Sequence, residues 1–262
     1  MLSPYFMGLI EKSLNAITEI PEETSMVVDD QKVFDILKSD GDINLKLKLN
    51  EKEINLEELE FLLNYPKVRR VKYLELNKNE FFDDGVKLIA TAPLLENLVE
   101  LSLASNKISD IGLSYLAKST TLKNIEALYL QKNQFGLLGL KKLASSKTLS
   151  KIKLLYLKGN PLGAEGAKIL AENSQWHSLK KLYLHGCNLG DLGLRYLCNS
   201  SVLDSVEELN LCFNQLTDSA VDILIESKIK LPILDISVNP ISESNIERLK
   251  TCGYFKTVLI AQ

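Results

Sequence analysis

A pattern of apolar residues returns along this sequence at a nearly constant spacing, and no other feature restricts the fold as strongly. In the copy that begins at Val71 it reads Val-x-x-Leu-x-Leu-x-x-Asn-x-Phe and ends at Phe81. Copies begin at residues 44, 71, 98, 125, 152, 179, 206, 231 and 255, so the step is 27 residues six times, then 25 and 24. A constant step of this length indicates a stack of repeated structural units.

The second half of each unit has the spacing of an amphipathic helix. Leu113, Leu116 and Ala117 follow the i, i+3, i+4 pattern of one helical face. The fifteenth position is glycine in five units, namely Gly85, Gly112, Gly139, Gly166 and Gly193. Aspartates stand where a helix N-cap is expected, namely Asp83, Asp110, Asp191 and Asp218. We therefore expect each unit to be a short strand, a turn and a helix of about 10 residues.

The full pattern, L-x-x-L-x-L-x-x-N/C-x-L, resembles the leucine-rich repeat, and the helical second half resembles its ribonuclease-inhibitor-like subfamily. The 27-residue unit is slightly short for that subfamily. The resemblance covers residues 44–262 and implies an α/β fold. The implied fold is a right-handed solenoid, shaped like a horseshoe, with parallel strands on the concave face and helices on the convex face. About eight units and a truncated last strand would make up this domain.

Asparagine at the ninth position is expected to be buried and bonded to the backbone of the turn that follows each strand. The residues concerned are Asn79, Asn106, Asn133, Asn160, Asn214 and Asn239. Cys187 takes this position in one unit, and we interpret it as a structural residue because a buried thiol is usually inert.

The two ends of the chain carry their own expectations. Residues 1–43 lack the repeat and hold nine acidic and three basic residues, a net charge of −6, and we predict a helical N-terminal cap there. An independent functional module is the alternative. The last strand, from Phe255 to Ile260, would leave one sheet edge unpaired. We expect either a capping tail beyond it or self-association through this edge.

The outward strand positions hold the candidate functional residues. The fifth position is tyrosine in three consecutive units, at Tyr129, Tyr156 and Tyr183. Tyrosine is common at binding hot spots, although it also suits any strand surface. We predict a partner-binding surface made of Tyr129, Tyr156, Tyr183, Leu154, Lys158, Lys181, His185 and Phe213.

Several kinds of chemistry are not expected. The net charge of −3 gives no general basic field for nucleic acid. The sequence contains no glycine-rich phosphate loop and no metal-binding cysteine spacing, so no cofactor or metal is expected. His185 and Cys212 share the seventh position of adjacent units, so they are expected to be neighbours. A thiolate nucleophile requires such a neighbouring histidine, but no acid that would orient the histidine is evident. No apolar run is long enough to cross a membrane.

The resemblance implies a non-enzymatic protein-binding scaffold. The subfamily includes enzyme inhibitors, sensor regions of cytosolic immune receptors and effectors that intracellular bacteria deliver into host cells. A bare, lysine-rich solenoid resembles the effectors most. Without a Sec-type signal the expected location is cytoplasmic, in its own cell or in a host cell. Two alternatives stay open: a tyrosine and lysine face that binds phosphorylated ligands or nucleic acid, and an enzyme regulator or Cys/His enzyme.

Overall fold

The computed structural model describes residue 8, residues 45–173 and residues 175–260. The described strands form one parallel sheet, in which each strand pairs with the next strand along the chain. They are β1 (Leu45–Lys48), β2 (Val71–Glu75), β3 (Glu100–Ser102), β4 (Ala127–Tyr129), β5 (Leu154–Tyr156), β6 (Lys181–Tyr183), β7 (Glu208–Asn210), β8 (Leu231–Asp235) and β9 (Phe255–Leu259).

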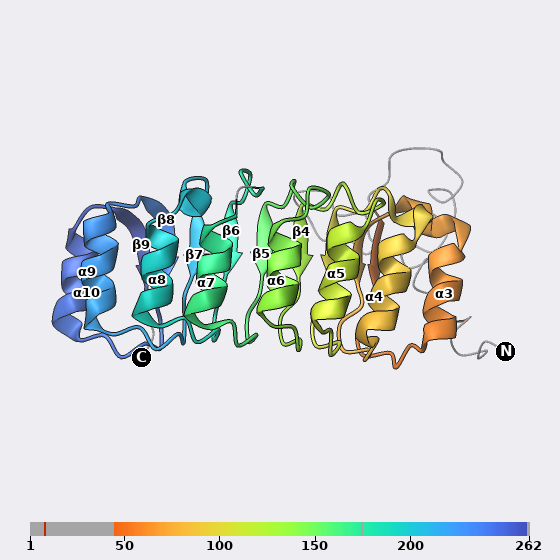
Figure 1. The fold of residues 1–262 in the computed structure, drawn as a ribbon, viewed down its shortest axis with the longest axis horizontal. Helices are drawn as coiled ribbons and strands as arrows, with labels where there is room; N and C mark the ends of the chain where they lie inside the picture. The colour runs from red at the N-terminus through yellow and green to blue at the C-terminus, as the bar shows by residue number, and fades with distance from the viewer. Residues whose placement is uncertain (1–7, 9–44, 174, 261–262) are drawn as a thin grey trace, which may run out of the picture.

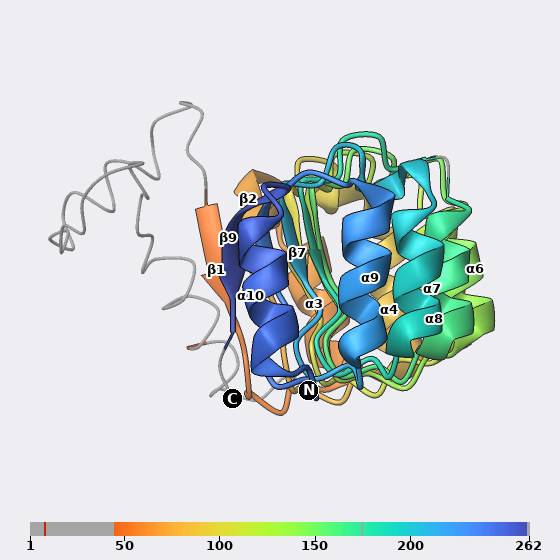
Figure 2. The same cartoon turned by 90° about the vertical axis from the view of Figure 1, so that its left-hand side faces the viewer.

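One α-helix follows each strand from β1 to β8. These helices are α3 (Leu56–Asn64), α4 (Phe82–Thr91), α5 (Asp110–Lys118), α6 (Leu137–Ala144), α7 (Gly163–Ala171), α8 (Gly190–Cys198), α9 (Asp218–Ser227) and α10 (Glu243–Thr251). Short 3-10 helices are η1 (Pro66–Arg70), η2 (Pro93–Leu95) and η3 (Ser201–Leu203). The helices stand side by side in front of the strands (Figure 1), and the end-on view separates the two layers (Figure 2).

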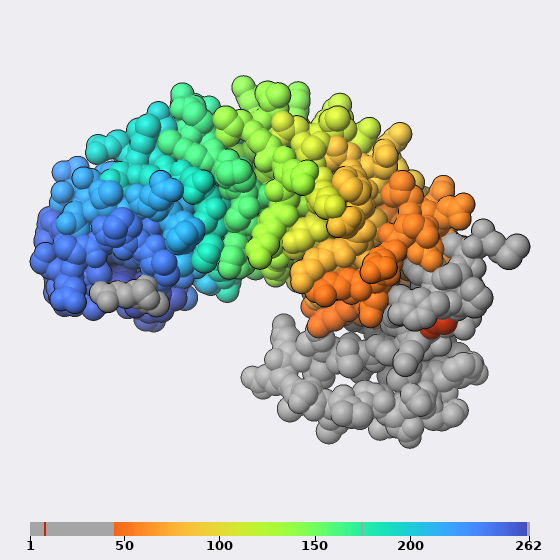
Figure 3. Space-filling model, turned by 90° about the horizontal axis from the view of Figure 1, so that it is seen from below, coloured from red at the N-terminus to blue at the C-terminus, as the bar shows by residue number. Residues whose placement is uncertain are grey.

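The described units follow an arch with the strand layer on its inner side (Figure 3). The structure thus confirms the predicted α/β horseshoe of parallel strands and outer helices. A helix is wider than a strand, so a stack of such units bends with the strands on the inside.

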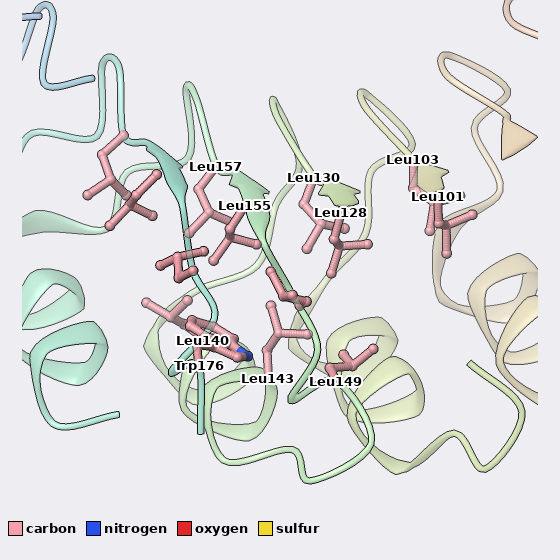
Figure 4. Packing of buried hydrophobic residues seen from close by; sticks show 14 of the residues in the cluster. Leu101, Leu103, Leu128, Leu130, Leu140, Leu143, Leu149, Leu155, Leu157 and Trp176 are labelled. Carbon is pink, nitrogen blue, oxygen red and sulfur yellow. The ribbon is translucent and has the colours of Figure 1, made fainter. Parts of the chain in front are cut away.

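Leucines of successive strands form the core in straight rows. The row expected at the fourth position is buried throughout, at most 1% exposed, and consists of Leu101, Leu128, Leu155, Leu182 and Leu209. Figure 4 shows such rows, with Leu140 and Leu143 of α6 and Trp176 closing the core on the helix side. The core therefore runs without a break from unit to unit.

The asparagine at the ninth position links each unit to the unit before it. The Nδ2 of Asn133 donates to the backbone oxygens of Leu103 and Leu130 at 3.0 and 2.9 Å. Its Oδ1 accepts from the backbone N–H groups of Asn106 and Ile108 at 3.0 and 3.1 Å. One buried side chain thus satisfies four backbone groups that water cannot reach.

Two members of this asparagine ladder differ from the rest. Asn239 makes the expected backbone bonds but is only half-buried, contrary to the prediction. Cys187 is buried, and its thiol contacts the backbone oxygen of Leu157 at 3.3 Å. It thus supplies the donor half of the asparagine pattern.

The aspartates near the helix starts bind the next helix, and the expected N-cap role is wrong. Asp110 lies in the first turn of α5, where Ser109 is the N-cap. The Asp110 Oδ1 accepts from the backbone N–H groups of Gly136 and Gly139 at the start of α6, at 2.7 and 2.8 Å. Its negative charge therefore stabilises the N-terminus of the neighbouring helix. The same link to the next unit is made by Asp83, Asp191 and Asp218.

In two units this link explains the glycine at the fifteenth position, whereas a Cβ on Gly166 or Gly193 would instead meet the Cβ of Leu162 or Leu189 in the same unit. A Cβ on Gly139 would lie 2.6 Å from the Oδ1 of Asp110 and 2.8 Å from its Cα. A Cβ on Gly112 would lie 2.5 Å from the Oδ1 of Asp83. Any side chain there would push the two helices apart, so the aspartate and the glycine of the following unit depend on each other.

The ends of the solenoid are only partly described. The predicted helical cap in residues 1–43 lies outside the described residues. Strand β9 pairs with β8, and among the described residues it has no second neighbour. Phe255 is 8% exposed, whereas Leu259 is 46% exposed. Self-association through this edge stays a prediction. No helix in the described part is both long and apolar enough to span a bilayer.

Replacing Leu155 by alanine should lower the free energy of unfolding by about 2–5 kcal/mol, because the side chain is fully buried. Leu154→Ala is the matched control in the same strand, since Leu154 is half-exposed, and it should cost well under half as much. Urea denaturation followed by circular dichroism measures both. Equal losses for the two variants would contradict the assigned register.

Candidate functional site

The strand register brings equivalent residues of successive units together in columns across the concave face. At the fifth position Ser102 pairs with Tyr129, Tyr129 with Tyr156, Tyr156 with Tyr183, and Tyr183 with Asn210. The three tyrosines are therefore neighbours, as the spacing predicts, and we refer to them as the tyrosine column. We name the other columns by their position in the unit.

The rings of the tyrosine column stack on one another. The centroids of Tyr129 and Tyr156 are 5.9 Å apart with 30° between the ring planes, and those of Tyr156 and Tyr183 are 4.7 Å apart at 29°. Each ring is half-buried. A stacked row on rigid strands loses little conformational entropy on binding, because its rotamers are already restricted.

The three hydroxyls differ in what they bond. The Tyr183 hydroxyl donates to the Oε1 of Glu208 at 2.5 Å. Among the described residues the hydroxyls of Tyr129 and Tyr156 have no hydrogen-bond partner. Burial, with a smaller contribution from the carboxylate of Glu100, raises the pKa of Tyr129 to about 12. Burial also raises the pKa of Tyr156, so both hydroxyls stay protonated at neutral pH and can donate to a partner.

The lysines around the column are less available than the sequence suggests. Lys181 pairs with Glu208 at 2.9 Å. Lys153 pairs with Glu126, and Lys180 with Glu207, each at 2.8 Å. The positive charge of these three lysines is thus largely neutralised by neighbouring glutamates. Burial raises the pKa of Glu208, but the hydrogen bonds from Tyr183 and Lys181 outweigh burial and leave that pKa below its usual value.

Sequence reasoning missed these glutamates, although the sequence contains their signal. Each of the three pairs joins residues 27 positions apart, which is one repeat. Lys78–Glu51 and Lys107–Glu80 follow the same rule at 2.6 and 2.8 Å. Opposite charges one repeat apart are therefore direct neighbours in a solenoid of this kind.

Phe213 stands at the rim of the concave face, in the turn after β7. It is 59% exposed, and its φ of 55° lies in the left-handed region. The two preceding units carry glycine at this position, and a Cβ on Gly186 would lie 3.6 Å from the Phe213 ring. The ring therefore lies over the Gly186 turn, and its centroid is 6.3 Å from that of His185. The same positive φ occurs at this position in the other units, so it belongs to the repeat turn, but an exposed phenylalanine is a candidate contact residue.

The predicted binding residues lie in neighbouring columns of strands β4 to β7 and the turns after them. Leu154 is half-exposed in the third column, between Ala127 and Lys181. Lys158 and His185 are half-buried in the seventh column, and Lys181 is exposed. The structure therefore brings the eight predicted residues onto one part of the concave face.

His185 and Cys212 do not form an activated nucleophile. Burial, and then the carboxylate of Asp235, raises the pKa of the Cys212 thiol. Burial, and then the ammonium of Lys158, lowers the pKa of the His185 imidazole. Both groups are thus favoured in their neutral forms, whereas a catalytic pair needs a thiolate beside an imidazolium. In the described residues no three His, Cys, Asp or Glu side chains gather as metal ligands.

Cys212 should react with iodoacetamide at neutral pH at least about tenfold more slowly than N-acetylcysteine does. The reason is that its raised pKa and its burial keep it a protonated thiol. Peptide mapping by mass spectrometry measures its alkylation rate. A rate above that of the small thiol would favour the Cys/His enzyme alternative.

Comparison with known proteins agrees with the observed fold. The sequence model of the leucine-rich repeat family matches residues 95–117 and 177–198. No curated protein sequence matches the chain. A solved Bacteroides fragilis protein is 16% identical with a TM-score of 0.50, over 80% of this chain and 70% of that one.

Two further bacterial structures are similar at lower TM-scores. An internalin of Listeria monocytogenes is 21% identical over 82% of this chain and 58% of its own, with a TM-score of 0.49. A leucine-rich repeat protein of Leptospira interrogans is 21% identical over 82% of this chain and 54% of its own, with a TM-score of 0.48. The chain thus spans less than two thirds of either structure. With its matched repeats, and with the one parallel sheet and the outer helices of its described residues, the chain has the leucine-rich repeat fold.

Proposed function

We propose that this chain is a non-catalytic scaffold that binds a protein partner on its concave face, with the tyrosine column and Phe213 at the centre of the contact. The leucine-rich repeat fold is typical of protein–protein interaction scaffolds, whose extended inner surface is the usual binding surface. The proposed contact residues are Tyr129, Tyr156, Tyr183, Leu154, Lys158, Lys181, His185 and Phe213.

The stacking of the tyrosine column carries the proposal. Three aromatic rings in contact offer a large apolar surface, and two of them carry a hydroxyl without a partner among the described residues. Aromatic residues held in one rotamer are the usual energetic centre of a protein interface.

The two alternative functions are less well supported. Nucleic acid needs many free cations, but Lys153, Lys180 and Lys181 are paired with glutamates. A Cys/His enzyme needs an ionised thiol, whereas the pKa of Cys212 is raised. Action in a host cell and a cytoplasmic location stay predictions that follow from the resemblance.

Removing two rings of the tyrosine column should abolish most of the partner binding. The Tyr156→Ala, Tyr183→Ala variant should capture its partner from an extract of the producing cells at least about tenfold less than the unaltered protein. Quantitative mass spectrometry compares the captured proteins, and circular dichroism checks that the variant is folded.

The matched control removes two tyrosines from the outer helices. Tyr115 and Tyr196 are half-buried there, each beneath a lysine ammonium at 5.9 and 5.8 Å from the ring centroid. The Tyr115→Ala, Tyr196→Ala variant should capture the partner normally. Loss of capture in this control alone would place the binding surface on the convex face and would overturn the proposal.

A further inference from the structure

We infer that the concave face selects a partner segment rich in aspartate and glutamate, whose carboxylates bind Lys132 and Lys158. The inference rests on the proposed function of this face and adds the chemistry of the partner. The segment would lie along the seventh and eighth columns, which run from Asn50 to Ser237 and from Glu51 to Val238 just beyond the strand ends.

The first observation is that Lys132 and Lys158 lack the ion pairs that the lysines next to the tyrosine column make. Lys153, Lys180 and Lys181 each have a glutamate as partner. In the part of the chain that the structure describes, no carboxylate lies within ion-pair distance of the ammonium of Lys132 or Lys158. Lys158 is half-buried, so water screens its charge less than that of a fully exposed lysine.

The second observation is the separation of charge across the face. Glu100 and Glu208 lie in the third column, on the strands themselves. The seventh and eighth columns contain one carboxylate among the described residues, that of Glu51, and it pairs with Lys78 at 2.6 Å. The strip beyond the strand ends is therefore positive at Lys132 and Lys158, whereas the carboxylate of Asp235 reaches its far end. The pKa of His185 reflects both: after burial, the charge of Lys158 lowers it and that of Asp235 raises it.

The third observation is a groove of about 360 Å³ beside the two lysines. Ala104 and Ser105 line it, and the equivalent positions of the next unit hold Gln131 and Lys132. The short side chains therefore leave a hollow next to longer ones. Tyr156, Lys132 and Lys158 line the same groove, so its ammonium groups and a tyrosine share one space.

The polar groups around this groove can bond a peptide. Lys78 and Glu51 also line it, as an ion pair. Its donors include the ammoniums of Lys132 and Lys158 and the hydroxyl of Tyr156, which has no partner among the described residues. A carboxylate side chain would satisfy these donors.

A peptide fits this pattern better than nucleic acid. The lysines without a carboxylate partner occupy only a narrow part of the face, and the carboxylates of Glu100 and Glu208 lie across the same face. A nucleic acid carries a phosphate at every nucleotide and would meet these carboxylates. A peptide can place its acidic residues at the lysines alone.

Binding of a dodecapeptide of alternating glutamate and alanine tests the inference. Titration followed by NMR should show saturable shifts at the seventh and eighth columns, which weaken as salt is added. The Lys132→Gln, Lys158→Gln variant should bind it at least about tenfold more weakly. The control variant Lys153→Gln, Lys180→Gln has the same change in net charge and should bind within about twofold of the unaltered protein.

Three results would overturn the inference: equal weakening in the two variants, equal binding of the peptide with glutamine in place of glutamate, or tighter binding of an oligothymidylate of the same length. Capture of the partner by the tyrosine and lysine variants distinguishes failure of this inference from failure of the proposed function. If its capture depends on Tyr156 and Tyr183 but not on Lys132 and Lys158, the acidic-segment inference fails while the concave-face proposal stands.

Discussion

Hydrogen bonds between neighbouring parallel strands repeat in one register along the solenoid, and the positions of all other groups follow from them. Leu74 pairs with Leu101, and Leu101 pairs with Leu128. The register continues into the turns, where the backbone N–H of Ser105 donates to the oxygen of Gln131 at 2.9 Å. A single unit cannot bury its leucines alone, so each unit depends on its neighbours for stability.

The same register determines what the concave face presents. It converts three tyrosines that are 27 residues apart in sequence into rings in contact. It also brings Lys153 and Lys181 onto glutamates of the neighbouring units, which removes their charge from the centre of the face. What remains available is an aromatic row, two of whose hydroxyls have no partner among the described residues, with Lys132 and Lys158 beside it.

The features that depend only on the repeat period could be predicted from the sequence. The buried leucine row, the parallel sheet and the tyrosine column all follow from counting positions within the unit. The features that depend on distances between neighbouring elements could not. The bond from Asp110 to the start of α6 requires the separation of two helices, and the bond from Tyr183 to Glu208 requires a diagonal reach across strands. Neither contact can be predicted from the spacing of residues in the sequence.

Native-state hydrogen exchange of an Asn133→Leu variant tests most directly whether the asparagine ladder holds adjacent units in register. Asn133 accepts from the backbone N–H groups of Asn106 and Ile108, and Asn214 accepts in the same way from those of Cys187 and Leu189. The account predicts that the first pair exchanges at least about tenfold faster in the variant while the second pair is unchanged. Unchanged exchange at both pairs would contradict it, because the ladder would then contribute nothing to holding the units together.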